Sequence, residues 1–109
     1  MVNKILRAAG VPYDRAIFRE KPRPATYAVY MDSREVGGAD GINCLITHHI
    51  TIELYATKTE NPQAEALEAE LDAQGLEWTS QGWYWLPEEQ RYQEVYEFTY
   101  IEKRRVTHA

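Results

Sequence analysis

Two adjacent histidines, His48 and His49, are the residues of this 109-residue chain best suited to chemistry. Imidazole nitrogens bind transition metals and transfer protons near neutral pH. Both histidines lie in ITHHITIELYA, residues 46–56, where apolar and polar residues alternate. A period of two predicts a β-strand, on which neighbouring side chains point to opposite faces. We therefore predict that the two rings share neither a metal ion nor a substrate, that His48 is packed, and that His49 faces solvent.

Other groupings of reactive residues also favour structural roles. Cys44 is the single cysteine, which excludes a four-cysteine zinc site and an internal disulfide. The glycine-rich stretch at 33–41 lacks the Lys-Ser/Thr pair and the following helix of a phosphate-binding loop, so we predict a flexible hairpin connection there. The acidic residues of 65–72 have no neighbouring base or nucleophile and are interpreted as a solvated helix face. We predict no catalytic residue, no metal ligand and no cofactor, and we expect that the protein is not an enzyme.

The charge is unevenly distributed along the chain, whose net charge is −5. Residues 1–36 carry seven basic and four acidic side chains, residues 37–100 carry two and twelve, and residues 101–109 carry three and one. Such a chain can be self-complementary when copies pack head to tail, although an unevenly charged solvated surface is the simpler interpretation. The negative total argues against a dedicated nucleic-acid binder.

Residues at the start of the chain carry no apolar stretch of signal-peptide length, and no stretch is long enough to span a bilayer. One cysteine suits a reducing compartment. We expect the protein to be made in the cytoplasm, which it would leave only as part of a larger particle.

Hydrophobic periodicity predicts two helices. Apolar residues spaced three and four apart in 2–9 predict a short amphipathic helix, and Gly10 is placed to end it. A second helix is predicted over 61–74, where Asn61 suits the N-cap and Pro62 suits the first helical position.

Alternating patterns predict the strands. The expected strands are 25–32, 44–56, 76–79, 83–86 and 91–102, and residues 16–19 are a candidate for a further short edge strand. Residues 80–82 are predicted to form a hairpin turn between two of these strands. Residues 103–109 show no pattern and are predicted to be a mobile basic tail.

Together these elements predict one α+β domain over residues 1–109 in the order α-β-β-α-β-β-β. The expected sheet is largely antiparallel, has four to five strands, and carries both helices on one face. The strands at 44–56 and 91–102 are long for so small a domain, so we expect exposed strand edges that a monomer covers poorly.

The order of these elements and several phrases of sequence resemble the tail-terminator, or tail-completion, proteins of long-tailed bacteriophages and prophages. The matching phrases are KPRPATYAVYMD, ITHHITIELYATKTENPQAEALEAELDAQGLEW and EEQRYQEVYEFTYIEKR, and with the short first helix they cover about residues 1–104. None of them is a catalytic signature.

The resemblance implies a structural virion protein located in the tail or neck. Members of this family form a ring, typically of six copies, on the end of the tail tube, where it stops tail polymerisation and joins the tail to the head. The implied partners are other copies of the chain, the tail-tube protein and a head–tail connector or neck protein, and DNA would pass through an acidic lumen without specific binding.

Our hypothesis for self-association or partner contact rests on charge and on loops that order on contact. The candidate contact residues are Arg19, Lys21, Arg23, Gly37, Gly38, Asp40, Glu65, Glu68 and Asp72.

Two alternatives remain open at the level of sequence. One is a neighbouring role in the same particle, as a head-completion or neck adaptor protein. The other is a small-molecule-binding or enzymatic α+β domain, in which Trp78, Trp83 and Trp85 would line an apolar pocket. The same tryptophans would equally suit packing on the core.

Overall fold

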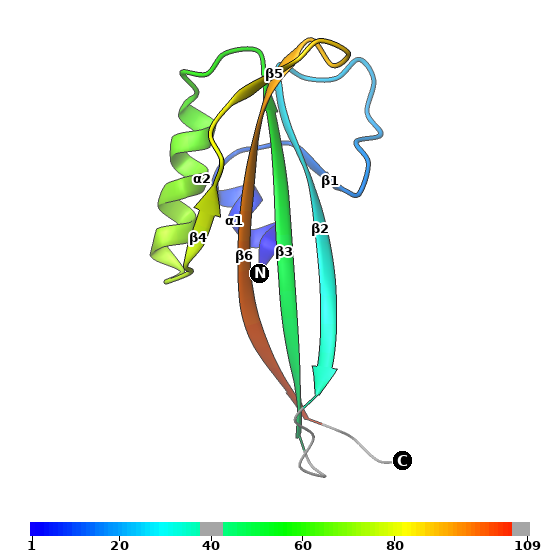
Figure 1. Ribbon diagram of the computed structural model, residues 1–109, viewed down its shortest axis with the longest axis vertical. Coiled ribbons are helices and arrows are strands. Elements are labelled where there is room, and N and C mark those ends of the chain that lie inside the picture. Colours follow the sequence, from blue (N-terminus) through cyan, green and yellow to red (C-terminus); the bar gives the residue numbers. More distant parts are fainter. Residues whose placement is uncertain (38–42, 106–109) are drawn as a thin grey trace.

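The computed structural model describes residues 1–37 and 43–105 and consists of two helices and six strands (Figure 1). The elements are α1 (Val2–Ala8), β1 (Tyr13–Arg15), β2 (Thr26–Gly37), β3 (Asn43–Ala56), α2 (Pro62–Ala73), β4 (Trp78–Ser80), β5 (Tyr84–Leu86) and β6 (Arg91–Arg105). Within the described ranges, neither helix has the length and apolar character needed to cross a membrane.

All six strands belong to one sheet. The strand order is β1-β2-β3-β6-β4, and β5 also pairs with β6. The pair β1–β2 is parallel and the other pairs are antiparallel, so the sheet is mixed. The prediction of an α+β fold is confirmed, but the predicted four to five strands were too few.

The short edge strand lies earlier than predicted. Residues 16–19 are not a strand: β1 occupies Tyr13–Arg15, and Ala16 has a φ of 66°, in a region that extended strands do not use. Phe18 instead packs with Tyr27 and Val29 in a small cluster of its own. The chain therefore turns away from the sheet where the sequence suggested that it paired.

The predicted hairpin at residues 80–82 is wrong. Both β4 and β5 pair with β6, with Ser80 opposite Tyr96 and Tyr84 opposite Gln93. The chain thus continues in one direction along the same edge of β6, and residues 81–83 interrupt the pairing without reversing it. The reversal comes later, between β5 and β6.

Two of the long strands continue beyond their predicted ends. Strand β6 runs to Arg105, because residues 103–105 pair with 43–45 of β3, so the predicted mobile tail was wrong for these residues. Strand β2 includes residues 33–37, which the sequence assigned to a loop. The predicted loop positions Gly38 and Asp40, and tail residues 106–109, lie outside the described residues.

Side chains of both helices and of the sheet form the main core. Alternation along β3 is confirmed, since Ile46, His48, Ile50, Ile52, Leu54 and Ala56 are all buried. Side chains of α1 and α2 join Ile50, Ile52 and Leu54 in one hydrophobic cluster. The predicted cap of α2 is also confirmed, because Asn61 Oδ1 accepts a hydrogen bond from the Ala64 N–H at 2.9 Å.

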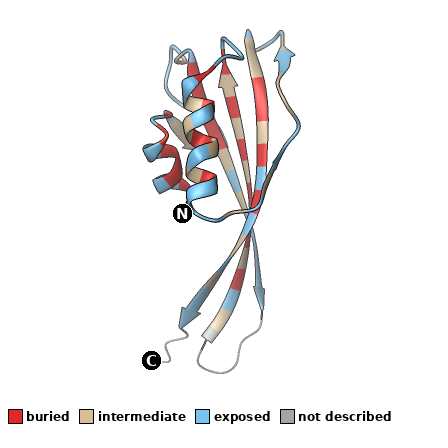
Figure 2. Ribbon diagram, turned by 90° about the vertical axis from the view of Figure 1, so that its left-hand side faces the viewer, coloured by how far each residue is buried: buried red, intermediate tan, exposed pale blue. Residues whose placement is uncertain are grey.

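Strands β2, β3 and β6 project past the helices as a three-stranded arm, which Figure 2 shows to be mostly exposed or half-buried. We define the arm as residues 31–37, 43–49 and 99–105, and the rest of the described chain as the body. The arm makes the molecule elongated, with principal extents of 50 × 27 × 21 Å.

Candidate self-association site

The arm has two open strand edges. Strand β1 covers only residues 28–30 of β2, so the edge of β2 at 31–37 pairs with nothing in the described chain beyond β3. On the other side, β4 and β5 cover β6 only at 96–98 and 91–93, which leaves the described edge at 99–105 open. Each open edge is a row of backbone donors and acceptors that another strand could pair with.

The two open edges suit each other geometrically. Strands β2 and β6 are both antiparallel to β3, so they run in the same direction on opposite sides of it. A copy that placed its β2 beside the β6 of a neighbour, in the same orientation, would continue the sheet with a repeating strand order. Such a contact is head to tail, and it forms a closed ring if the rotation between copies closes.

The body carries opposite charges on the same two lateral sides of the sheet as the open edges. The basic connector, residues 15–23, begins at the last residue of β1 on one lateral side and carries four basic side chains against one acidic side chain. Helix α2 lies near β4 on the other side, as Figure 1 shows, and residues 60–77 carry six acidic side chains and no basic one. A neighbour that pairs edge to edge would therefore bring a basic side against an acidic side.

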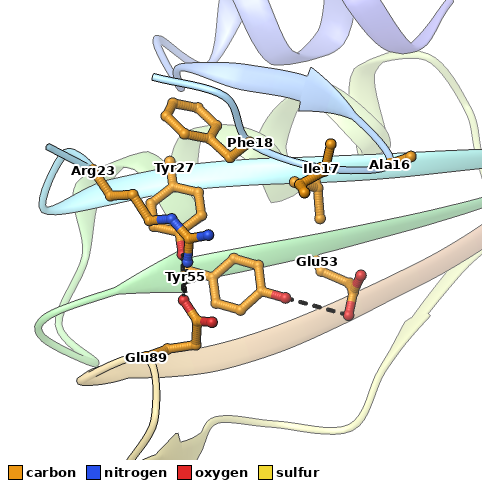
Figure 3. Close-up of a pocket in the computed structure, with 9 residues that line it drawn as sticks. Ala16, Ile17, Phe18, Arg23, Tyr27, Glu53, Tyr55 and Glu89 are labelled. Carbon is orange, nitrogen blue, oxygen red and sulfur yellow. Dashed lines mark hydrogen bonds and ion pairs between the residues drawn. The ribbon is translucent and has the colours of Figure 1, made fainter. Parts of the chain in front are cut away.

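The structure gives Arg19 and Arg23, both predicted contact residues, partners within the chain. The backbone N–H of Arg19 donates to Asp14 Oδ2 at 2.8 Å. The Arg23 guanidinium pairs with Glu89, and the Tyr27 hydroxyl also donates to that carboxylate, at 3.0 Å (Figure 3). Arg23 is thus held mainly by its own chain.

Lys21 and Gly37 lie on the surface, as the hypothesis requires. Lys21 belongs to the basic connector, and Gly37 ends β2 at the tip of the arm. The structure therefore places these two residues on the same lateral side of the sheet, with Lys21 in the body and Gly37 at the tip of the arm.

The ion pair between Arg23 and Glu89 depends on pH. Burial works to raise the pKa of Glu89, but the hydrogen bonds from Tyr27 and Arg23 outweigh it and hold the pKa below its usual value. A carboxyl whose pKa is lowered by folding stabilises the folded state above its unfolded pKa, and this contribution is lost as the pH falls through the folded pKa. The network is therefore complete at neutral pH.

This network forms one wall of a cavity of about 180 Å³ on the sheet face opposite to Ile52 and Leu54. Figure 3 shows its lining, which consists of Ala16, Ile17, Phe18, Arg23, Tyr27, Val29, Glu53, Tyr55 and Glu89. Gln93 donates to Glu53 and to the Tyr55 hydroxyl, both at 2.9 Å. Burial, followed by the nearby Glu53, raises the pKa of Tyr55 to about 12.

The cavity gives little support to the small-molecule alternative. It is smaller than the roughly 300–1,000 Å³ of typical ligand pockets, and its polar groups already bond to one another. Of the three tryptophans, Trp78 and Trp83 pack against the main core, while Trp85 is 44% exposed and stacks edge-on against Tyr92. The tryptophans therefore do not gather around one pocket.

Helix α2 is less solvated than predicted. Glu65 is exposed, but Glu68 is half-buried and accepts a hydrogen bond from the hydroxyl of buried Tyr96 at 2.8 Å. Asp72 accepts one from the Trp78 indole N–H, also at 2.8 Å. Burial, then the bond to Glu68, raises the pKa of Tyr96 far above its usual value. Glu68 and Asp72 thus tie α2 to β6 and β4, and only Glu65 of the three predicted acidic contacts faces outward without such a bond.

The sequence interpretation placed residues 31–32 and 99–102 of the open edges in strands but missed residues 33–37 and 103–105. Beyond Ile101, residues 102–105 of β6 are all charged, so no alternation of apolar and polar residues marks the end of this strand. Pairing with β3 extends that strand, and no local pattern reports a partner so distant in sequence.

Both histidines lie where their alternation predicted, with His48 buried and His49 exposed. In the part of the chain that the structure describes, no group of three or more His, Cys, Asp or Glu side chains is arranged to hold a metal ion. Compared with protein-family models and with curated proteins, the chain matches none.

Proposed function

We propose that this protein is a structural, non-enzymatic component of a bacteriophage or prophage particle. In this proposal it forms a homo-oligomeric ring, of six copies by analogy with tail terminators, at the end of the tail tube. The ring stops tail polymerisation and joins the tail to the head. The protein would act in the virion tail or neck after assembly in the host cytoplasm.

The observation that carries this proposal is the pair of open edges on the arm. Residues 31–37 and 99–105 are seven-residue edges on opposite sides of one sheet, and within the described chain neither is covered. Natural proteins usually block such edges, because an open edge recruits further strands. A ring in which each β2 pairs with the next β6 would cover both open edges of the arm and leave neither of them for uncontrolled growth.

Charge distribution supports the same arrangement. The acidic side of the body, at 60–77, would face the basic connector of the next copy. An excess of acidic side chains lining the lumen would let DNA pass through the ring without binding, because like charges repel.

Disulfide cross-linking tests the edge contact. Ser33 on β2 and Thr99 on β6 lie opposite His49 in the same cross-strand row, on the same sheet face. In a Cys44→Ser background, we expect Ser33→Cys combined with Thr99→Cys, or with Ile101→Cys for a shifted register, to give a ladder of covalent oligomers on oxidation. Gel electrophoresis under non-reducing conditions measures the ladder.

The matched controls are the three single-cysteine variants, which should stay monomeric on the same gel. Covalent dimers from a single variant would show a two-fold contact between like edges. A native mass equal to that of a monomer, with no ladder in either register, would rule out the head-to-tail ring.

Assembly on tail tubes tests the biological role. We expect the mass of the particle in solution to increase when purified tail-tube protein is added, and we expect phage that lack this protein to make tails of uncontrolled length in electron micrographs. Binding to the portal side of the neck, with no affinity for tube protein, would instead support the head-completion alternative.

A further inference from the structure

The two open edges of the arm have the same length and the same direction. Strand β1 stops pairing with β2 at Tyr30, so the open edge of β2 is 31–37. Strand β4 pairs with β6 no further than Phe98, so the described open edge of β6 is 99–105. Both edges run from the body towards the tip of the arm. Two copies can therefore pair along the whole of both edges in one register, with residue 31 opposite residue 99.

The alternation of side chains restricts the register independently of edge length. Within one copy Ser33 and Thr99 lie in the same row, because both are opposite His49. Only a shift by an even number of residues from this row keeps the helices of neighbouring copies on the same face of a shared sheet. The register that places 31 opposite 99 is shifted by two residues, so it meets this condition.

Other even shifts use the edges less completely. Without a shift, residues 31 and 32 would lie opposite Glu97 and Phe98, which already pair with β4. With a shift of four, residues 36 and 37 would lie beyond Arg105, the last residue of β6. The two-residue shift is therefore the even shift that matches the two edges from end to end.

The two-residue shift also brings opposite charges together on both faces of the sheet. On the face that carries His48, Arg34 of one copy would lie opposite Glu102 of the next copy. On the other face, Glu35 would lie opposite Lys103. Opposite charges that face each other on neighbouring strands stabilise the pairing, and like charges weaken it.

Neither alternative shift produces these ion pairs. Without a shift, Arg34 would lie opposite Tyr100 and Glu35 opposite Ile101. With a shift of four, Arg34 would lie opposite Arg104, which places like charges together. Edge length and charge thus favour the same register.

Of the two ion pairs, that between Glu35 and Lys103 depends less on contacts within the chain. The Glu35 side chain is 75% exposed, and its Oε1 lies 3.2 Å from Nε2 of the exposed His49. Lys103 is exposed near the tip of the arm. Glu102, in contrast, already accepts a hydrogen bond from Arg104 at 3.0 Å. Glu35 and Lys103 are therefore the better pair for a test.

The bodies of two paired copies must diverge. In the two-residue shift, β1 of one copy and β4 of the next end at the same level, directly before the first paired row. These two strands occupy the space between β2 and β6 there, so only the arms can pair. The sheet twists at the base of the arm, where Figure 2 shows the strands crossing, so the arm and the body point in different directions.

We propose that residues 31–37 of one copy pair in parallel with residues 99–105 of the next copy, with residue 31 opposite residue 99. The ion pair between Glu35 and Lys103 of neighbouring copies selects this register. The inference rests on the ring of the proposed function, but it does not depend on the number of copies or on what the ring binds.

Charge reversal tests the ion pair. In sedimentation velocity over a dilution series, Glu35→Lys and Lys103→Glu should each raise the apparent dissociation constant of the oligomer on the order of fivefold. The two changes together should restore the wild-type value. The matched control combines Lys103→Glu with Glu97→Lys, because Glu97 lies on the same face of β6 but opposite β4. This combination should remain as weak as Lys103→Glu alone.

Cysteine cross-linking separates the register from the ring. In a Cys44→Ser background, the combination Ser33→Cys with Ile101→Cys should cross-link more than the combination Ser33→Cys with Thr99→Cys. A wild-type protein that stays monomeric would overturn the ring and the register together. An oligomer that cross-links mainly in the combination with Thr99→Cys, or that the double charge reversal fails to restore, would overturn the register and leave the ring standing.

Discussion

Replacing Ile52 by alanine is expected to lower the free energy of unfolding by about 2–5 kcal/mol, measured by urea denaturation. Ile52 is 0% exposed in the middle of β3, between Tyr30 on β2 and Tyr96 on β6. It packs in the cluster that joins the helices to the sheet, so truncation leaves a cavity that neighbours cannot fill. A domain of this size is stable by only about 5–15 kcal/mol, so this loss is a large fraction of its total stability.

The matched control is Ile101→Ala. Ile101 is the same residue type on the open edge of the arm, where its side chain is 66% exposed. We expect its free energy of unfolding to change by less than about 0.5 kcal/mol, while the ring proposed above becomes weaker. A large loss of monomer stability in Ile101→Ala would show that the arm is part of the core.

Replacing Arg91 by methionine is expected to lower the free energy of unfolding by about 2–3 kcal/mol. Arg91 Nη2 donates to the carbonyl oxygens of Arg23 and Pro24 at 3.3 Å and 3.1 Å, and Nη1 donates to those of Glu89 and Gln90, both at 3.2 Å. The guanidinium thereby fastens the turn between β5 and β6 to the end of the basic connector. Methionine keeps the apolar stem but removes every donor.

Arg104→Met provides the comparison on the same strand. Arg104 is half-exposed and bonds only to Glu102 among the described residues, so its removal should change the free energy of unfolding by less than about 1 kcal/mol. Thermal denaturation of both variants under one set of conditions measures the difference. Equal losses would show that the backbone contacts of Arg91 contribute no more than a surface ion pair does.

The hydrogen bonds that Glu68 and Asp72 make within the chain require a revision of the charge-based contact hypothesis. Changing Glu68 or Asp72 to lysine would break bonds to Tyr96 or Trp78, so a loss of assembly would not separate a poor interface from a damaged body. Glu65 and Lys21 are exposed and are better positions at which to test charge complementarity between copies. Reversal of both charges together should restore whatever binding a single reversal removes.

Sequence by itself determined the local features of this protein. The alternation along residues 46–56 correctly assigned the two faces of β3, and it separated His48 from His49. The cap at Asn61 correctly placed the start of α2. These features follow from strand periodicity and from capping within one turn of helix, so neighbouring residues suffice to specify them.

Only the tertiary structure decided which distant residues meet. It paired β4 and β5 with the same edge of β6, and it extended β6 to Arg105 by pairing with β3. It also joined Tyr96 to Glu68, His48 to Glu102 and Arg23 to Glu89, which are 28, 54 and 66 residues apart. Strand register and cross-sheet contacts depend on the packing of the whole domain, so a pattern within a few residues cannot report them.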